Sequence, residues 1–173
     1  MKIIYFLILL SVFFGCKTKQ GITKNVPAYI QNIACPDDGI CTFEVIKDSS
    51  LEIKSDEFGS LYPEIIPGNK LIVKYEYKRI EIENTADSSY SEFIYFELDS
   101  IEEHFILKDN DLQKVKLLYG RICFCRGSSG YFKITEGTLF IDKHSNTLDV
   151  DLQFKTPKGI PQINSHIKEK ITY

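Results

Sequence analysis

The chain has 173 residues, with 24 acidic and 21 basic side chains and a formal net charge of −3. This length suffices for one domain with its own hydrophobic core, and the mild, evenly spread charge contains no basic run that could track nucleic acid. Its aromatic residues are tyrosine and phenylalanine without tryptophan, and together with the abundant isoleucine they favour β-sheet over helix.

The first element is a short apolar segment. Met1 and Lys2 give a positive start, and residues 3–14 are apolar apart from Ser11. An apolar run of about a dozen residues is too short to cross a bilayer, which takes roughly 20 residues, and it fits the core of an export signal. Residues 1–15 are therefore predicted to be a signal peptide.

The end of this segment carries a family resemblance. The sequence VFFGC at residues 12–16 resembles the lipobox of bacterial lipoproteins, and the resemblance ends at Cys16. It implies cleavage before Cys16 and lipidation of that residue, so that acyl chains anchor the protein to a membrane. Lys17 stands where an aspartate would signal inner-membrane retention. The resemblance therefore implies an exported lipoprotein of the outer membrane, facing the periplasm or the cell surface.

The rest of the chain divides into a tether and one domain. Residues 16–27 are predicted to be the lipidated cysteine and a flexible polar tether, and residues 28–173 a single β-rich domain. Residues 71–77 and 148–154 alternate apolar and polar side chains, and residues 90–98 are apolar on both faces, as in an inner strand. A slip in the pattern predicts a bulge near Lys78 and Arg79, followed by a polar hairpin loop at 84–89.

Weaker patterns complete the predicted elements. Further strands are predicted at 28–34, 41–47, 50–55, 116–125, 131–135, 138–143 and 163–171, with turns at 127–130 and 136–137 and one short helix within 109–118. The predicted fold class is all-β: an antiparallel β-sandwich of about eight to ten strands, with an open β-barrel as the alternative and at most one short helix.

Four cysteines follow Cys16 in two motifs, Cys35 and Cys41 in CPDDGIC and Cys123 and Cys125 in CFC. An even number of cysteines in an exported chain predicts disulfides, whether within each motif or between the motifs. The PDDG turn places Cys35 and Cys41 across a tight loop. In an extended chain the CFC α-carbons would lie about 7 Å apart, at the edge of disulfide geometry. A redox-active CFC motif and a four-thiolate metal site are the alternatives.

Other candidate motifs give little support for catalysis. His104, His144 and His166 are widely separated and share no ligand spacing, and no nucleophile elbow, zinc-protease or phosphate-loop motif occurs. Asp109 and Asp111 open a segment that lacks the glycine and glutamate of a calcium loop and is better explained as a turn or a helix cap. No cofactor and no metal are predicted.

The sequence thus predicts a lipid-anchored cell-envelope protein with a non-catalytic binding or structural role. Its partners would be a membrane, through the lipid, and an envelope protein or a glycan. Two alternatives remain. One is a thiol–disulfide oxidoreductase that uses Cys123 and Cys125. The other is a glycan- or peptide-binding sandwich in which strand tyrosines form the platform.

Overall fold

The computed structural model describes residues 35–173 apart from residues 82 and 102. The predicted signal peptide, Cys16, the tether and the predicted strand at 28–34 lie outside the described residues. The elements are β1 (Gly39–Ser55), β2 (Leu61–Pro67), β3 (Lys70–Arg79), β4 (Tyr90–Asp99), β5 (Glu103–Lys108), the 3₁₀ helix η1 (Asp109–Val115), β6 (Leu118–Cys123), β7 (Gly130–Lys133), β8 (Glu136–His144), β9 (Thr147–Lys155) and β10 (His166–Thr172). The all-β prediction is confirmed.

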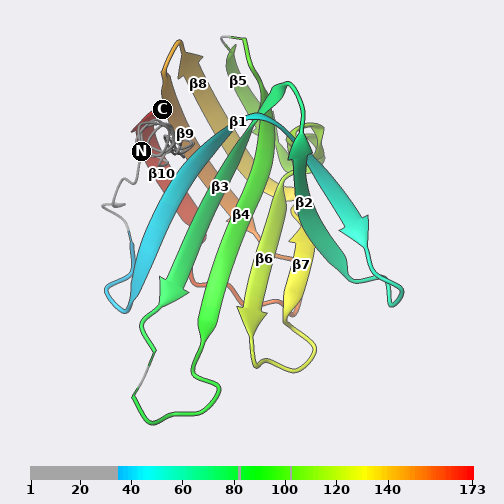
Figure 1. The fold of residues 1–173 in the computed structure, drawn as a ribbon, viewed down its shortest axis with the longest axis vertical. Helices are drawn as coiled ribbons and strands as arrows, with labels where there is room; N and C mark the ends of the chain where they lie inside the picture. Colours follow the sequence, from blue (N-terminus) through cyan, green and yellow to red (C-terminus); the bar gives the residue numbers. More distant parts are fainter. Residues whose placement is uncertain (1–34, 82, 102) are drawn as a thin grey trace, which may run out of the picture.

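The strands form two antiparallel sheets. Six strands in the order β1-β2-β7-β6-β4-β3 close into a barrel, and four strands in the order β10-β9-β8-β5 form a separate sheet. In Figure 1 the strands β8, β9 and β10 lie behind β1, β3 and β4. One of the two layers is thus a closed barrel, whereas the predictions were a sandwich or an open barrel. Within the described part of the chain, no helix has the length and apolarity needed to span a membrane.

The main hydrophobic core lies between the two sheets. The alternation predicted for 148–154 is observed, since Leu148, Val150 and Leu152 are at most 2 % exposed and face this core. β4 is an inner strand with apolar side chains on both sides, as predicted. Ile94 belongs to the main core, whereas Tyr95 belongs to a second, smaller cluster around Leu51, Ile72 and Leu118 inside the barrel.

The barrel closes through a narrow seam. β2 and β7 share one bridging pair, Leu61 with Tyr131, whereas β6 and β7 pair over four positions. Pro63 and Pro67 in β2 have no N–H to donate, and prolines are confined to strand edges for this reason. We attribute the short seam to these prolines, which also explain why the sequence pattern did not predict β2.

Two local predictions were wrong. β3 stays in register with β1 through Arg79, so there is no bulge at Lys78 and Arg79. The register shift lies instead between Ile46 and Ser49 in β1. The strands predicted separately at 41–47 and 50–55 are both parts of β1. Residues 136–137, predicted as a turn, begin β8. A side chain on Gly137 would come within 2.2 Å of the Gln153 carbonyl oxygen, so glycine permits this close strand approach.

Candidate functional site

We call the face of the first sheet that points into the barrel the concave face. Side chains on neighbouring strands form rows across it. Alternation along each strand and the observed registers define the rows. The row at the open end consists of Ile40, Lys78, Ser91 and Ile122. The next consists of Thr42, Glu76, Phe93, Gly120 and Tyr131, and the third of Glu44, Lys74, Tyr95 and Leu118. The sequence patterns predicted the strands but not these rows, because rows depend on register.

Three aromatic rings form the middle of the concave face. The ring centroids of Phe93, Tyr95 and Tyr131 lie 6.2 to 6.4 Å apart, and Phe93 and Tyr131 are only partly buried. A Cβ atom on Gly120 would lie 2.5 Å from the Tyr131 ring. The ring can occupy this position because glycine has no side chain. Burial raises the pKa of the Tyr95 and Tyr131 hydroxyls, which therefore remain protonated hydrogen-bond donors at neutral pH.

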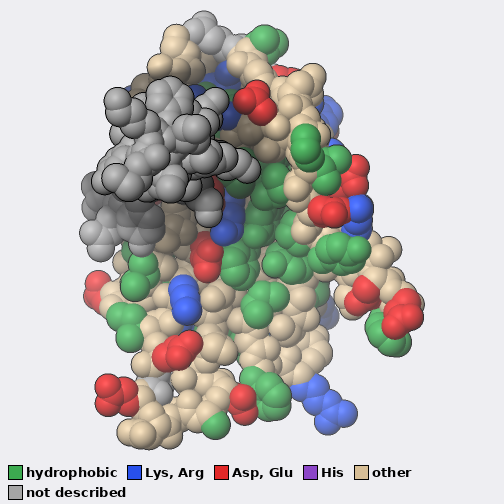
Figure 2. Space-filling model, in the orientation of Figure 1, with side chains coloured by type: hydrophobic (Ala, Val, Ile, Leu, Met, Phe, Trp, Pro, Cys, Tyr) green, Lys and Arg blue, Asp and Glu red, His purple; other side chains and the backbone are tan. Residues whose placement is uncertain are grey.

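Charged side chains border these rings. The Lys74 ammonium lies 3.3 Å from the Glu76 carboxylate, 4.0 Å from that of Glu44 and 5.9 Å from the Phe93 ring centroid. All three charged side chains keep a quarter to a third of their surface exposed. Hydrophobic side chains gather in the middle of the face seen in Figure 2, with basic and acidic groups beside them. The concave face thus offers apolar contact and both signs of charge.

The open end of the concave face carries exposed apolar side chains beside Lys78 and Ser91. Ile40 and Ile122, on β1 and β6, are 50 % and 42 % exposed, and Phe124, just beyond the end of β6, is 81 % exposed. A groove of about 390 Å³ at the seam is lined by Leu61, Tyr131, residues of the loops before β2 and β7, and Pro157 of the β9–β10 connection. Exposed apolar side chains grouped in this way are typical of an interaction surface.

The opposite, convex face of the first sheet contains a buried polar network centred on Glu92, which is 1 % exposed. Its carboxylate accepts hydrogen bonds from the hydroxyls of Tyr90 (2.6 Å) and Tyr119 (2.9 Å) and from the backbone N–H groups of Ile163 (2.6 Å) and Asn164 (2.9 Å). The Asn164 side-chain amide donates a fifth bond, at 2.9 Å. Because these donors occupy the carboxylate, Glu92 fastens the connection between β9 and β10 to the barrel.

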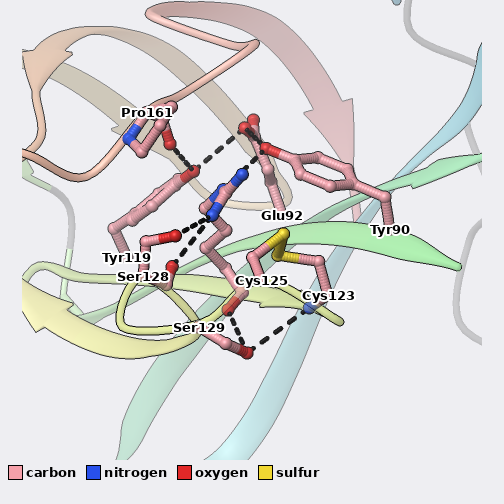
Figure 3. Close-up of a disulfide and its surroundings, with 9 residues drawn as sticks. Tyr90, Glu92, Tyr119, Cys123, Cys125, Ser128, Ser129 and Pro161 are labelled. Carbon is pink, nitrogen blue, oxygen red and sulfur yellow. Dashed lines mark hydrogen bonds between the residues drawn. A yellow bond between two sulfur atoms is a disulfide. The ribbon is translucent and has the colours of Figure 1, made fainter. Parts of the chain in front are cut away.

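Arg121 extends this network to the loop between β6 and β7. Its Nε donates to the Tyr90 hydroxyl (3.3 Å), and its Nη1 donates to the carbonyl oxygen (3.1 Å) and Oγ (2.6 Å) of Ser128. Figure 3 shows that Ser128, Ser129 and the Cys123–Cys125 disulfide lie in the same loop, beside Tyr90 and Glu92. Arg121 is 8 % exposed, and its guanidinium provides a positive charge held by hydrogen bonds at the base of this loop.

The four described cysteines form two local disulfides, Cys35–Cys41 and Cys123–Cys125, rather than bonds between the motifs. The first closes the predicted turn, in which the Gly39 N–H donates to the Pro36 carbonyl oxygen (3.1 Å). Cys41 is 1 % exposed, and its sulfur lies 3.1 Å from the Tyr75 hydroxyl. This disulfide therefore packs against the core between the two sheets.

The second disulfide lies in a different setting. β6 ends at Cys123, so the chain bends there instead of remaining extended through residue 125 as predicted. The bend brings the two α-carbons to 5.2 Å, within the usual range for a disulfide. Both cysteines are partly exposed and flank Phe124, which is 81 % exposed.

The histidines are not as separate as their spacing suggested. His104 Nδ1 and His144 Nε2 lie 3.5 and 2.9 Å from the same oxygen, Oδ1 of Asp142. His166 lies elsewhere on this sheet and contacts Asp151 at 2.8 Å. Among residues 35–173, without 82 and 102, no group of three or more His, Cys, Asp and Glu side chains is arranged to hold a metal ion.

Asp109 and Asp111 occupy the turn and the short helix expected of them. Asp109 begins η1 and accepts a hydrogen bond from the Gly137 N–H (3.0 Å), and Asp111 pairs with Lys114 at 3.1 Å. Both carboxylates therefore stabilise local structure.

Comparison of the chain with protein-family models, with curated proteins and with solved structures finds no match.

Proposed function

We propose that this chain is a lipid-anchored protein of the bacterial cell envelope that binds an extended segment of another envelope protein on its concave face, without catalysis. The observation that carries this proposal is the partly exposed pair Phe93 and Tyr131 beside the charged groups of Lys74 and Glu76. Aromatic rings supply large apolar contact at low entropic cost, and they are enriched at protein–protein interfaces.

Two exposed isoleucines at the open end, in a row with Lys78 and Ser91, favour a polypeptide over a glycan. Ile40 and Ile122 can pack against side chains but cannot hydrogen-bond to sugar hydroxyls. Lys74 and Glu76 add the ability to recognise charged side chains of either sign. By contrast, the carboxylate of Glu92 on the convex face is engaged in internal hydrogen bonds and supports the fold.

The experiment is selection of binding peptides from a random library displayed on phage, using the purified domain, followed by calorimetric titration of the selected peptides. We expect Phe93→Ala combined with Tyr131→Ala to weaken the affinity at least tenfold. The matched control is Tyr62→Ala, which removes a 41 % exposed tyrosine of the same sheet outside these rows. Equal loss in both variants, or selection of glycans on an array in place of peptides, would overturn the proposal.

The anchor has its own test. The resemblance at residues 12–16 supports lipidation of Cys16 and placement in the outer membrane. We expect Cys16→Ser to abolish labelling with a radioactive fatty acid and to release the protein from membranes or leave it as an uncleaved precursor. A Cys16→Ser protein that is processed and membrane-bound like wild type would contradict the anchor.

A further inference from the structure

We propose that the Cys123–Cys125 disulfide is a thiol–disulfide exchange site that accepts two electrons from a dithiol protein of the envelope, whereas the Cys35–Cys41 disulfide is permanent. This inference is independent of the proposed binding function.

The first support is the difference in accessibility between the two disulfides. An incoming thiolate must reach a sulfur atom, and exposed disulfides are generally the labile ones. Cys41 is 1 % exposed and packs in the main core, and Cys35 packs against the same core. Cys125 lies outside any strand, after a phenylalanine that is 81 % exposed. The difference therefore lies in Cys41, since Cys35, Cys123 and Cys125 are all partly exposed: the first bond has one buried sulfur, whereas both cysteines of the second are partly exposed.

The second support is the polarity of the site. Arg121 and Cys123 lie two positions apart on β6 and therefore on the same face of the strand. A guanidinium on the same face as a thiol favours its thiolate form, although the Glu92 carboxylate opposite Arg121 reduces this effect. Cys123 packs against the core whereas Cys125 belongs to the loop, so the geometry makes Cys125 the sulfur that is attacked and Cys123 the leaving thiolate.

The exchange balances as two successive displacements. A partner thiolate attacks Cys125 Sγ, a bond forms between the partner and Cys125, and the electron pair of the broken bond passes to Cys123. The second thiolate of the partner then attacks the partner's first sulfur, which is bonded to Cys125 in this mixed disulfide. Cys125 is released as a thiolate. The partner leaves oxidised, and the protein holds two thiols after taking up two protons.

The third support is that the loop has other bonds that hold it when the disulfide is open. Ser129 Oγ donates to the Arg121 carbonyl oxygen (3.2 Å) and accepts from the Cys123 N–H (3.4 Å), and the Ser128 N–H donates to the Cys125 carbonyl oxygen (3.2 Å). Figure 3 shows the Ser129 bonds directly beside the disulfide. These bonds keep the two cysteines close, so that reduction is reversible.

The experiment equilibrates the mature protein with dithiothreitol at defined oxidised-to-reduced ratios, traps thiols by alkylation and quantifies each cysteine peptide by mass spectrometry. We expect Cys123 and Cys125 to become alkylated together at a ratio at least tenfold more oxidising than Cys35 and Cys41 require. Near-ultraviolet circular dichroism at that ratio should remain native. Reduction of both disulfides at the same ratio, or of Cys35–Cys41 first, would overturn the proposal.

A second measurement separates exchange from loss of structure. The Cys35→Ala, Cys41→Ala variant retains only the Cys123–Cys125 bond and should show the same equilibrium ratio for it as wild type. Acid-trapped envelopes should contain a mixture of thiol and disulfide forms of Cys123 and Cys125. A pair that is fully oxidised in cells growing with an active dithiol pathway would contradict exchange in the envelope.

Discussion

Glu92 and Phe93 are neighbours on β4 and face opposite sides of one sheet. On the convex face the Glu92 carboxylate is buried and receives its hydrogen bonds from within the fold. On the concave face Phe93 remains partly exposed, beside a lysine and a glutamate that also keep contact with water. The difference arises because the second sheet and the β9–β10 connection cover the convex face, whereas Ile40 and Ile122 at the open end of the curled sheet are 50 % and 42 % exposed.

This comparison assigns stability to one face and recognition to the other. Substitutions on the convex face should therefore change the free energy of unfolding, and substitutions on the concave face should change binding more than stability.

Glu92→Gln should give the largest loss of stability. All five groups around the Glu92 carboxylate donate hydrogen bonds to it. The amide of glutamine turns an NH₂ group toward some of these donors and leaves them buried without an acceptor, at a cost of about 3 kcal/mol. Urea denaturation measures the loss. The matched control is Glu76→Gln on the concave face, a partly exposed carboxylate whose change should stay within about 0.5 kcal/mol. Similar effects of the two substitutions would refute the assignment of stability to the convex face.

Replacing Cys35 and Cys41 together with alanine should be next in size. The chain-entropy estimate for so short a loop is about 2 kcal/mol, and the protein should still fold because the core between the sheets is intact. Thermal melting should therefore show a lower midpoint with a cooperative transition. The double alanine variant of Cys123 and Cys125 should lower the midpoint less. The hydrogen bonds from Arg121 to Ser128 and from the backbone N–H of residue 123 to Ser129 still hold that loop. The reverse order would contradict the comparison of the two loops.

Gly120→Ala should disturb the concave face. The new methyl group would lie 2.5 Å from the Tyr131 ring and 3.3 Å from Phe93 Cβ, so the ring must move, at a cost of about 1 kcal/mol. We expect an altered near-ultraviolet circular dichroism spectrum and weaker peptide binding, with modest destabilisation. A variant with the wild-type spectrum and affinity would show that the ring position is not set by the glycine.

Glu169→Gln should have the smallest effect, of opposite sign. Glu169 lies on β10 with a buried oxygen that lacks a hydrogen-bond partner, and burial raises the pKa of its carboxyl above the ordinary value of 4.5. The folded state therefore holds this proton more tightly than the unfolded state, and Glu169 makes stability fall as pH rises through the interval above 4.5. The variant should lack this fall and be slightly more stable at pH 7. The measurement is the denaturation midpoint of both proteins between pH 4 and pH 8. If the midpoint of Glu169→Gln depends on pH as that of wild type does, the prediction is wrong.

Much of the fold was predictable from local patterns. The alternation at 148–154, the two-sided apolar strand at 90–98 and the turn at Pro36 each depend on residues close in sequence, and each is present. β2 was missed because its two prolines are unusual in strands, and β5 because six residues carry too short a pattern.

Less of the candidate site was predictable. The CFC motif was visible as a possible redox element, and the strand tyrosines as a possible platform. Glu92 gave no signal, since a single acidic residue in an apolar strand does not reveal which donors will surround it. The sharing of Asp142 by His104 and His144 was also hidden, because His104 is brought to Asp142 by pairing between β5 and β8.

The sequence by itself therefore determined most of the strands and the local turn that brings Cys35 to Cys41, and residues 12–16 predict the lipid anchor. Those features follow from side-chain period, turn chemistry and a short motif, all of which act over a few residues. Only the tertiary structure decided that one layer closes into a barrel and that Glu92 meets Asn164, 72 positions away. It also decided that Phe93 and Tyr131 share a concave face. Register between distant strands sets these contacts, and it is fixed by packing of the whole core.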